Sequence, residues 1–311
     1  MTVLQQYVRQ SRPVRVVRDR AKKIIVPGTE GLSLYEVTKF FLQGIRNSRL
    51  NVSCAAVTYN FLMAIPPTLL FLFSLVPYLP LHDVQNTILM VLRYITPNVN
   101  AYNNISGIIV DFMNNTQEGV LSFGLLLTIF FSSNGMMGLI RNFEKSLPFY
   151  VKRSGLRKRW TAIKLTFMLM GVVILTLAAL IIQSQELNEI ILQVFDNTLV
   201  PRLVSLLIIG LLIFSSISVV YTYGPSLNDR FDFVSPGSVF ATILCIITTF
   251  VFYFLVNNFI NYSKVYGSIG SIMAFMVWMW LNTMVILLGY ELNVSIMLAQ
   301  TSKNDVPEAQ V

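Results

Sequence analysis

Charged and metal-binding side chains are scarce in this chain. Only 12% of its 311 residues are Asp, Glu, Lys or Arg, and it holds two cysteines and a single histidine, His82. One histidine cannot form the His/Cys/carboxylate cluster that a zinc site needs. The sequence also lacks the GxxxxGK[ST] loop that cradles nucleotide phosphates and the GxSxG turn of serine hydrolases. We therefore expect no metal, no other cofactor and no enzymatic activity, and ATP-driven transport by this chain alone has no support.

Long apolar runs are abundant. Hydrophobic residues make up 54% of the chain, and a window of about 19 residues finds several runs long enough to cross a bilayer. Lipid admits only helices or closed barrels, and unalternated runs such as Ile163–Ile182 exclude the barrel. We predict an all-α polytopic membrane protein with six transmembrane helices at Val52–Pro77, Val120–Phe143, Thr161–Gln183, Pro201–Tyr223, Gly237–Asn257 and Ile269–Leu298.

The positions of the positive charges predict the orientation. If the spans alternate, twenty of the 23 Lys and Arg residues fall on one side of the membrane, and positively charged loops remain in the cytoplasm. We therefore expect both termini in the cytoplasm. The same rule accounts for the net charge of +8.

The basic run Arg153–Trp160, RSGLRKRW, allows a second interpretation as a nucleic-acid site. No aromatic stacking platform accompanies it, and a cytoplasmic loop that follows the positive-inside rule accounts for it. We expect anionic lipid headgroups, and no nucleic acid, as partners. The residues predicted to contact headgroups are Arg15, Arg18, Lys22, Lys23, Arg157, Lys158 and Arg159.

The chain divides into three parts. Residues 1–50 form a basic cytoplasmic segment ending in an amphipathic helix on the inner membrane surface, with a capping box at Ser33 and Glu36. Residues 51–298 hold the six spans, and amphipathic patterns at about 78–119 predict an outer helical hairpin. Residues 299–311 form a cytoplasmic tail that we expect to be disordered.

Polar residues inside the predicted spans must face protein or water. In the first span, the Pro66-Pro67 pair predicts a kink that frees backbone carbonyls. One interpretation is a polar cavity that opens inward, lined by the first, second and sixth spans. The other is that each polar side chain bonds to a neighbouring helix and holds the bundle together. The residues that would line the cavity are Asn60, Pro66, Pro67, Ser133, Asn134 and Asn282.

Glu291 lies near the inner end of the sixth span, where an ionised carboxylate needs a cationic or hydrogen-bonding partner. We predict that Arg141, at the inner end of the second span, is this partner and that the two form an inner latch. The amphipathic surface helix is the alternative partner. Glu291 does not share a face with Asn282, because nine residues at about 100° each place them on opposite sides of a straight helix.

Three stretches form a family-like pattern: VSCAAVTYNFLMAIPPTLLF, VVYTYGPSLNDRFDFVSPGSVFATIL and VYGSIGSIMAFMVWMWLNTMVILLGYELN. Their most specific elements are Tyr266-Gly267-Ser268, Trp278 or Trp280, Leu288-Gly289-Tyr290-Glu291-Leu292, Tyr221 with Pro225, and Pro236-Gly237. Over residues 40–298 the chain thus resembles the YihY/virulence factor BrkB family of bacterial inner-membrane proteins. It departs from the usual pattern at Asn60 and in its double proline.

The resemblance implies six transmembrane helices in the bacterial cytoplasmic membrane. Links of the family to envelope integrity, serum resistance and export of ions or lipids favour transport. Members have also carried a ribonuclease label, which a membrane-embedded chain with one histidine and no carboxylate cluster does not support. We expect a transporter or lipid-translocation factor of the cell envelope. The alternative is a structural envelope protein that docks a protein partner, and convergence of the polar groups on one cavity would distinguish the two.

Overall fold

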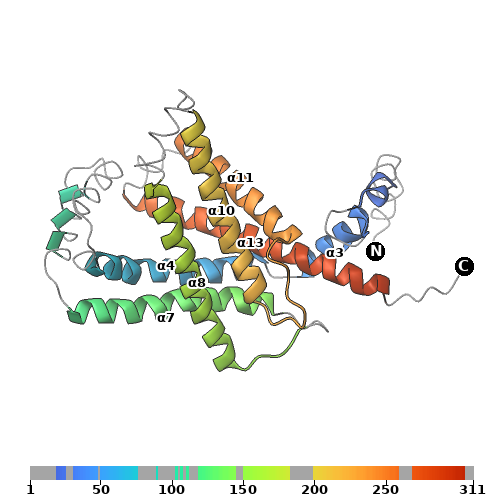
Figure 1. Cartoon of the computed structure of the whole chain (residues 1–311), viewed down its shortest axis with the longest axis horizontal. Coiled ribbons are helices and arrows are strands. Elements are labelled where there is room, and N and C mark those ends of the chain that lie inside the picture. Colours follow the sequence, from blue (N-terminus) through green and yellow to red (C-terminus); the bar gives the residue numbers. More distant parts are fainter. Residues whose placement is uncertain are drawn as a thin grey trace, which may run out of the picture.

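Helices make up most of what the computed structural model describes, which is residues 19–25, 31–47, 50–75, 118–144, 150–182, 199–258 and 268–304, with a few positions between 89 and 111. Figure 1 shows their arrangement. The helices are α3 (Leu34–Asn47), α4 (Leu50–Leu75), α7 (Glu118–Phe143), α8 (Gly155–Ile182), α10 (Leu199–Tyr223), α11 (Pro236–Asn258) and α13 (Ser268–Asn304).

The helices from α4 to α13 coincide with the six apolar runs of the sequence. Within the described residues, four of them (α7, α10, α11 and α13) are long and apolar enough to cross a membrane by length and composition. The same residues form no β-strand, only two isolated bridges. The described part of the chain therefore confirms the all-α class and a membrane protein with several apolar helices.

The α4 and α7 helices lie side by side (Figure 1). Two glycines of α7 permit their close approach: a Cβ at Gly135 would lie 2.7 Å from the Phe61 ring, and one at Gly138 would lie 3.1 Å from Val57. Because the later glycine meets the earlier residue of α4, the helices are antiparallel. Small residues at such contacts are typical of membrane helices, which lack a hydrophobic driving force between them. α8 packs on both α7 and α10, and α8 and α10 cross the α4–α7 pair (Figure 1).

A second close pair is α11 with α13, where Gly237 faces Gly289. A Cβ at Gly289 would lie 2.6 Å from the Ala241 Cβ and 2.8 Å from the Gly237 carbonyl oxygen. The side chain of Asn293 accepts the Gly237 N–H at 2.7 Å, which satisfies one of the free donors in the first turn of α11. Further along the pair, Thr249 meets Asn282, so these helices are also antiparallel.

The predicted amphipathic helix is α3, and its capping box is confirmed. The Glu36 N–H donates to Ser33 Oγ at 3.3 Å, and the Ser33 N–H donates to Glu36 Oε2 at 3.0 Å. The apolar face of α3 packs on the C-terminal half of α13, and Phe41 meets Phe240 of α11 edge to face. A separate buried cluster forms there from Leu32, Val37, Ile296 and Ala299, with Phe40 and Leu292 packed against it.

The structure bears on two predictions about the helices. α4 continues through Pro66 and Pro67 without interruption, so the double proline at which a kink is predicted lies within one continuous helix. The prolines lack N–H groups, however, which leaves the carbonyls of Leu62 and Met63 without their usual donors. α13 continues to Asn304, so the predicted tail begins as helix and not as disordered chain. The predicted outer hairpin at about 78–119 lies outside the described residues apart from a few positions.

Candidate functional site

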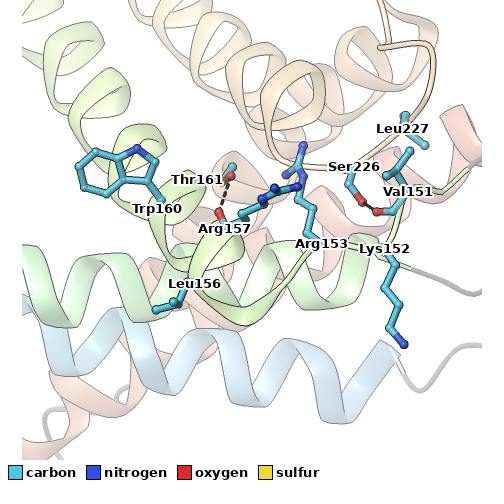
Figure 2. A pocket seen from close by; sticks show the side chains of 9 residues that line it. All are labelled: Val151, Lys152, Arg153, Leu156, Arg157, Trp160, Thr161, Ser226 and Leu227. Atoms are coloured by element: carbon cyan, nitrogen blue, oxygen red, sulfur yellow. Dashed lines mark hydrogen bonds between the residues drawn. The ribbon is translucent and has the colours of Figure 1, made fainter.

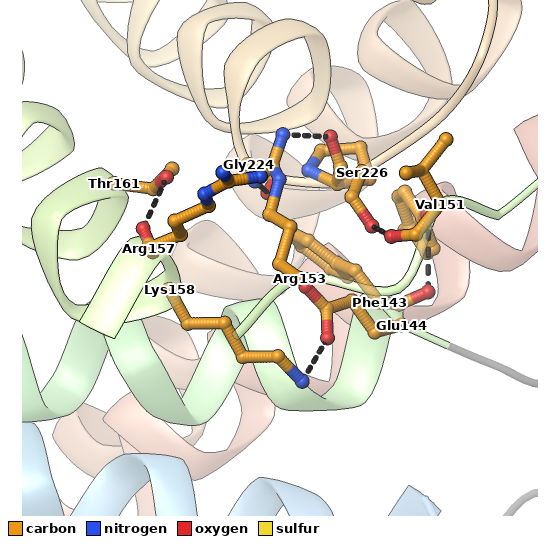
Figure 3. Close-up of polar contacts among 11 residues, drawn as sticks. Phe143, Glu144, Val151, Arg153, Arg157, Lys158, Thr161, Gly224 and Ser226 are labelled. Atoms are coloured by element: carbon orange, nitrogen blue, oxygen red, sulfur yellow. Dashed lines mark hydrogen bonds and ion pairs between the residues drawn. The ribbon is translucent and has the colours of Figure 1, made fainter. Parts of the chain in front are cut away.

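Two connections meet at one end of the molecule: residues 150–154, which precede α8, and residues 224–235, which join α10 to α11. The Val151 N–H donates to the Ser226 carbonyl at 2.8 Å, and Ser226 Oγ donates to the Val151 carbonyl at 2.5 Å (Figure 3). These paired bonds hold the start of α8 against the end of α10. We call this the cationic end, because it carries Lys152, Arg153, Arg157, Lys158 and Arg159.

Arg153 binds the backbone at the end of α10. Its guanidinium donates to the carbonyls of Gly224 at 3.0 Å and Pro225 at 3.1 Å (Figure 3). Burial lowers the pKa of Arg153, while the Glu144 carboxylate opposes this shift and Arg230 adds to it. The ordinary pKa of arginine is so high that the side chain remains charged. Arg153 therefore joins two connections and leaves a positive charge between them.

An open pocket of about 620 Å³ lies between these connections (Figure 2). Its walls come from three places: the extended segment before α8, the first two turns of α8, and the segment after α10. Three of the lining side chains are cationic and none is acidic. The lining residues are Val151, Lys152, Arg153, Leu156, Arg157, Trp160, Thr161, Ser226 and Leu227.

The three consecutive cations predicted to contact headgroups have different surroundings. Arg157 lines the pocket. Lys158 forms an ion pair with Glu144 (Figure 3). Arg159 donates to the Asn134 side chain of α7 and lies 4.9 Å from the centre of the Phe130 ring. The helix thus turns one cation toward the pocket and uses the next two to hold α8 on α7.

Buried aromatic rings pack beside the pocket. Phe143, at the end of α7, stacks on Tyr290 of α13 with ring centres 3.9 Å apart, and Tyr221 of α10 meets both rings edge to face. The Tyr290 hydroxyl lies 2.5 Å from that of Tyr150. Burial raises the pKa of Tyr150, with the nearby Glu291 and Glu144 carboxylates contributing and its hydrogen bond to Tyr290 opposing. The rings thereby join three helices at the cationic end.

The residues predicted to line a polar cavity have different hydrogen-bond partners. Asn60 donates to its own helix at the Ala56 carbonyl, 2.8 Å away. Asn134 accepts from α8, as described above. Asn282 donates to the Trp278 carbonyl at 2.9 Å and accepts from Thr249 of α11 at 3.4 Å.

The other three residues predicted to line the cavity are one serine and two prolines. Ser133 is fully buried and donates to the Phe130 carbonyl at 3.0 Å, within its own helix. Pro66 is exposed and Pro67 is half-buried on α4. In a low-dielectric interior each polar group needs a nearby partner, and these groups find theirs locally. The hydrogen bonds of Asn60, Ser133, Asn134 and Asn282 therefore run to other partners and not to one another.

A smaller void does separate α4 from α13, and it is apolar. Its volume is about 210 Å³. None of the residues predicted for the polar cavity lines it. The lining residues are Ala55, Thr58, Tyr59, Leu62, Met276, Val277 and Trp280.

Glu291 and Arg141, the predicted latch, lie in different surroundings. Arg141 is exposed on α7. The Glu291 side chain is only 3% exposed, and its carboxylate lies against the backbone of Gly44 in α3, where a Cβ would collide with Oε1 and lie 2.8 Å from Cδ. This geometry favours the alternative partner, the amphipathic helix, over Arg141.

The N-terminal headgroup contacts are only partly described. Arg15 and Arg18 lie outside the described residues. Lys22 and Lys23 are exposed, and the Lys22 ammonium lies 5.6 Å from the centre of the Tyr35 ring.

Sequence reasoning missed the roles of Lys152, Arg153, Ser226 and Asn293. In the sequence, Arg153 and Lys152 are only two more charges of a basic loop. Arg153 binds backbone carbonyls, and Lys152 lines a pocket formed by distant segments, so neither role can be read from neighbouring residues. A usable signal lay in the family-like elements. Tyr221, Pro225, Gly237 and Gly289 all meet near the cationic end, where Tyr221 donates to the Ile286 carbonyl at 2.5 Å.

Long apolar helices that pack through glycines, with cations gathered at one end, define a multi-pass helical membrane protein. The chain belongs to the virulence factor BrkB family, whose profile matches residues 41–310.

Two relatives are similar to the chain over most of its length. The chain is 32% identical over 249 residues to the ribonuclease-like protein YfkH of Bacillus subtilis (strain 168). The aligned region covers 77% of this chain and 87% of that protein. It is 24% identical over 257 residues to a UPF0761 membrane protein of Tolumonas auensis, covering 81% of this chain and 82% of that protein. No solved structure matches the chain.

Proposed function

We propose that the chain is a six-span protein of the bacterial cytoplasmic membrane with both termini in the cytoplasm. The antiparallel pairs α4–α7 and α11–α13 support alternating passes. The end of α10 and the start of α8 meet at the cationic end, as alternation requires. The positive-inside rule then directs the cationic end toward the cytoplasm.

We further propose that the protein transports or translocates lipid in the cell envelope. The cationic pocket is the observation that carries this proposal. Lys152, Arg153 and Arg157 line it without an acidic neighbour in its wall, so the pocket attracts anions. Leu156 and Trp160 beside these charges are exposed, as expected where a protein meets lipid headgroups. The headgroup of an anionic lipid matches both properties.

In this proposal the pocket replaces the predicted polar cavity as the site that opens toward the cytoplasm. Of the residues predicted to contact headgroups, Arg157 contacts the lipid headgroup in the pocket, whereas Lys158 and Arg159 hold α8 in place. Arg15, Arg18, Lys22 and Lys23 add diffuse attraction for anionic membrane surfaces, worth about 1 kcal/mol for each cation near the surface.

A structural envelope protein that docks a protein partner is the second candidate. The separate contacts of Asn134 with α8 and of Asn282 with α11 favour it, because groups that only hold helices together behave in this way. The pocket would then anchor lipid without moving it.

We propose that the chain is not an enzyme, and the ribonuclease-like name remains that of the Bacillus relative. Over the described residues, no group of three His, Cys, Asp or Glu side chains could hold a metal ion. The pocket wall also offers no carboxylate or imidazole to act as a general base.

Reconstitution tests the proposal. Liposomes that contain the protein and a fluorescent phosphatidylglycerol are treated with dithionite, which bleaches only the outer leaflet. A lipid-translocating protein exposes inner-leaflet label, so bleaching should exceed that of protein-free liposomes. Bleaching equal to that of protein-free liposomes, together with an envelope defect in a deletion strain, would favour the structural candidate.

A further inference from the structure

The cations of the segment before and within the first turns of α8 divide into two sets. Arg153 is held by backbone carbonyls, Lys158 by Glu144 and Arg159 by Asn134. Over the part of the chain that the structure describes, the side chains of Lys152 and Arg157 have no hydrogen-bond or ion-pair partner, and both line the pocket. Two charges are therefore left for a ligand.

The two free cations are placed differently. In Figure 2, Arg157 extends from the first turn of α8 toward the segment after α10, whereas Lys152 extends away from that segment. Arg157 therefore reaches into the space between the connections, next to the charge of Arg153. Lys152 stands at the margin and attracts an anion without enclosing it.

The start of α8 adds a partial positive charge to the same wall. The first intrahelical bond runs from the Lys158 N–H to the Ser154 carbonyl at 3.1 Å. The N–H groups of Gly155, Leu156 and Arg157 have no acceptor within the helix, and they lie at the positive end of its dipole. A phosphate group beside Arg157 would thus meet a fixed guanidinium and a helix N-terminus together.

The surroundings of the pocket indicate a lipid as the source of the phosphate. Leu156 is 85% exposed and Trp160 is 61% exposed, and both line the pocket beside Arg157. A site for a soluble phosphate compound gains nothing from exposed apolar side chains at its rim. A phospholipid matches both the cations and the exposed apolar side chains. Its phosphate can lie at the level of Arg157, and its apolar part can cover Leu156 and Trp160.

We infer that this pocket binds one anionic phospholipid, with Arg157 contacting the phosphate, Lys152 contributing attraction, and Leu156 and Trp160 covering the adjacent apolar part. The inference rests on the proposed function only in taking lipid as the ligand. Lipid binding then occurs at a single site, with Arg157 as the contact residue, and not over a diffuse basic surface.

Native mass spectrometry of the full-length protein in detergent tests the inference. Titration with phosphatidylglycerol should give one adduct that forms at lower concentration than the adduct with phosphatidylcholine. Arg157→Gln should weaken phosphatidylglycerol binding about tenfold, as expected for the loss of a charge-assisted hydrogen bond. Lys152→Gln should weaken it less, and Arg157→Lys should recover part of the loss.

The matched control is Arg46→Gln, which removes the same charge from an exposed position of α3 that does not line the pocket. It should leave the affinity unchanged. Equal losses for Arg157→Gln and Arg46→Gln would reduce the site to nonspecific attraction and overturn the inference. If inorganic phosphate or a single-stranded oligonucleotide instead displaced phosphatidylglycerol at concentrations that leave phosphatidylcholine bound, that result would also overturn the inference.

Binding and translocation can fail separately. A specific adduct without lipid movement in liposomes would uphold the pocket and reject transport. Lipid movement that survives Arg157→Gln unchanged, with no specific adduct, would reject the pocket alone.

Discussion

At the residue scale, two glycines set how closely α11 can approach α13. Gly237 and Gly289 face each other, and Asn293 caps the Gly237 N–H from the opposite helix. Neither contact leaves room for a Cβ. The sequence showed these residues as isolated Pro-Gly and Leu-Gly elements, because nothing local indicates that positions so far apart in the chain touch.

We predict that Gly237→Ala destabilises the protein. The added Cβ would collide with the Gly289 carbonyl and lie 2.5 Å from Asn293 Oδ1, and overpacking of this kind costs about 1–3 kcal/mol. The control is Gly210→Ala in α10, where a Cβ meets nothing within 4 Å, and alanine favours a helix by up to about 1 kcal/mol. Thermal unfolding in detergent should show a lower midpoint for the first variant only. Equal midpoints would contradict the close contact.

A second prediction separates the two partners considered for Glu291. The carboxylate is buried against α3, whereas Arg141 is exposed. Arg141→Gln should therefore change the free energy of unfolding by less than about 0.5 kcal/mol, as surface substitutions do. Glu291→Gln should lower stability, and the double variant should show the sum of the single effects. Losses of similar size that do not add would instead establish the Glu291–Arg141 latch.

At the element scale, local pattern predicted the helices well, and their pairing less well. Apolar runs located the helices from α4 to α13, and the Ser33–Glu36 capping box located the start of α3, since both signals depend on neighbouring residues. The polar cavity was not predictable in the same way. Asn134 and Asn282 each found a partner on a helix whose position depends on the whole fold.

The docking of α3 on α13 gives an element-scale prediction. Gly44 allows the Glu291 carboxylate to lie beneath α3, so Gly44→Ala should displace the helix. Trypsin should then cleave faster after Lys39 and Arg46, which are exposed on α3. Gly171→Ala in α8 is the control, because a Cβ there meets nothing within 4 Å. Unchanged cleavage in both variants would show that α3 is not held by this contact.

At the scale of the whole molecule, the paired connections and the positive-inside rule bear on the orientation. The segments 150–154 and 224–235 belong to the same end, which we propose faces the cytoplasm because of its positive charges. The sequence predicted this polarity from charge alone. It could not predict the pocket, because its walls come from segments that become neighbours only after α8 and α10 have packed.

Single cysteines test this orientation in a background without Cys54 and Cys245. A cysteine at exposed Lys152 or Asp229 should react with a membrane-impermeant maleimide only after the cells are permeabilised. A cysteine at Asn103, in the long connection, should react in intact cells. Labelling of Lys152→Cys from outside would reverse the topology and remove the pocket from the cytoplasmic face.

We propose that the cationic pocket is a lipid site on the cytoplasmic side. The most direct test is a cryo-electron microscopy structure of the protein in nanodiscs that contain phosphatidylglycerol. We predict a lipid density in the pocket, with its phosphate beside Arg157 and its acyl chains against Leu156 and Trp160. A pocket that is empty of lipid, or filled by another part of the chain, would contradict the proposed lipid site.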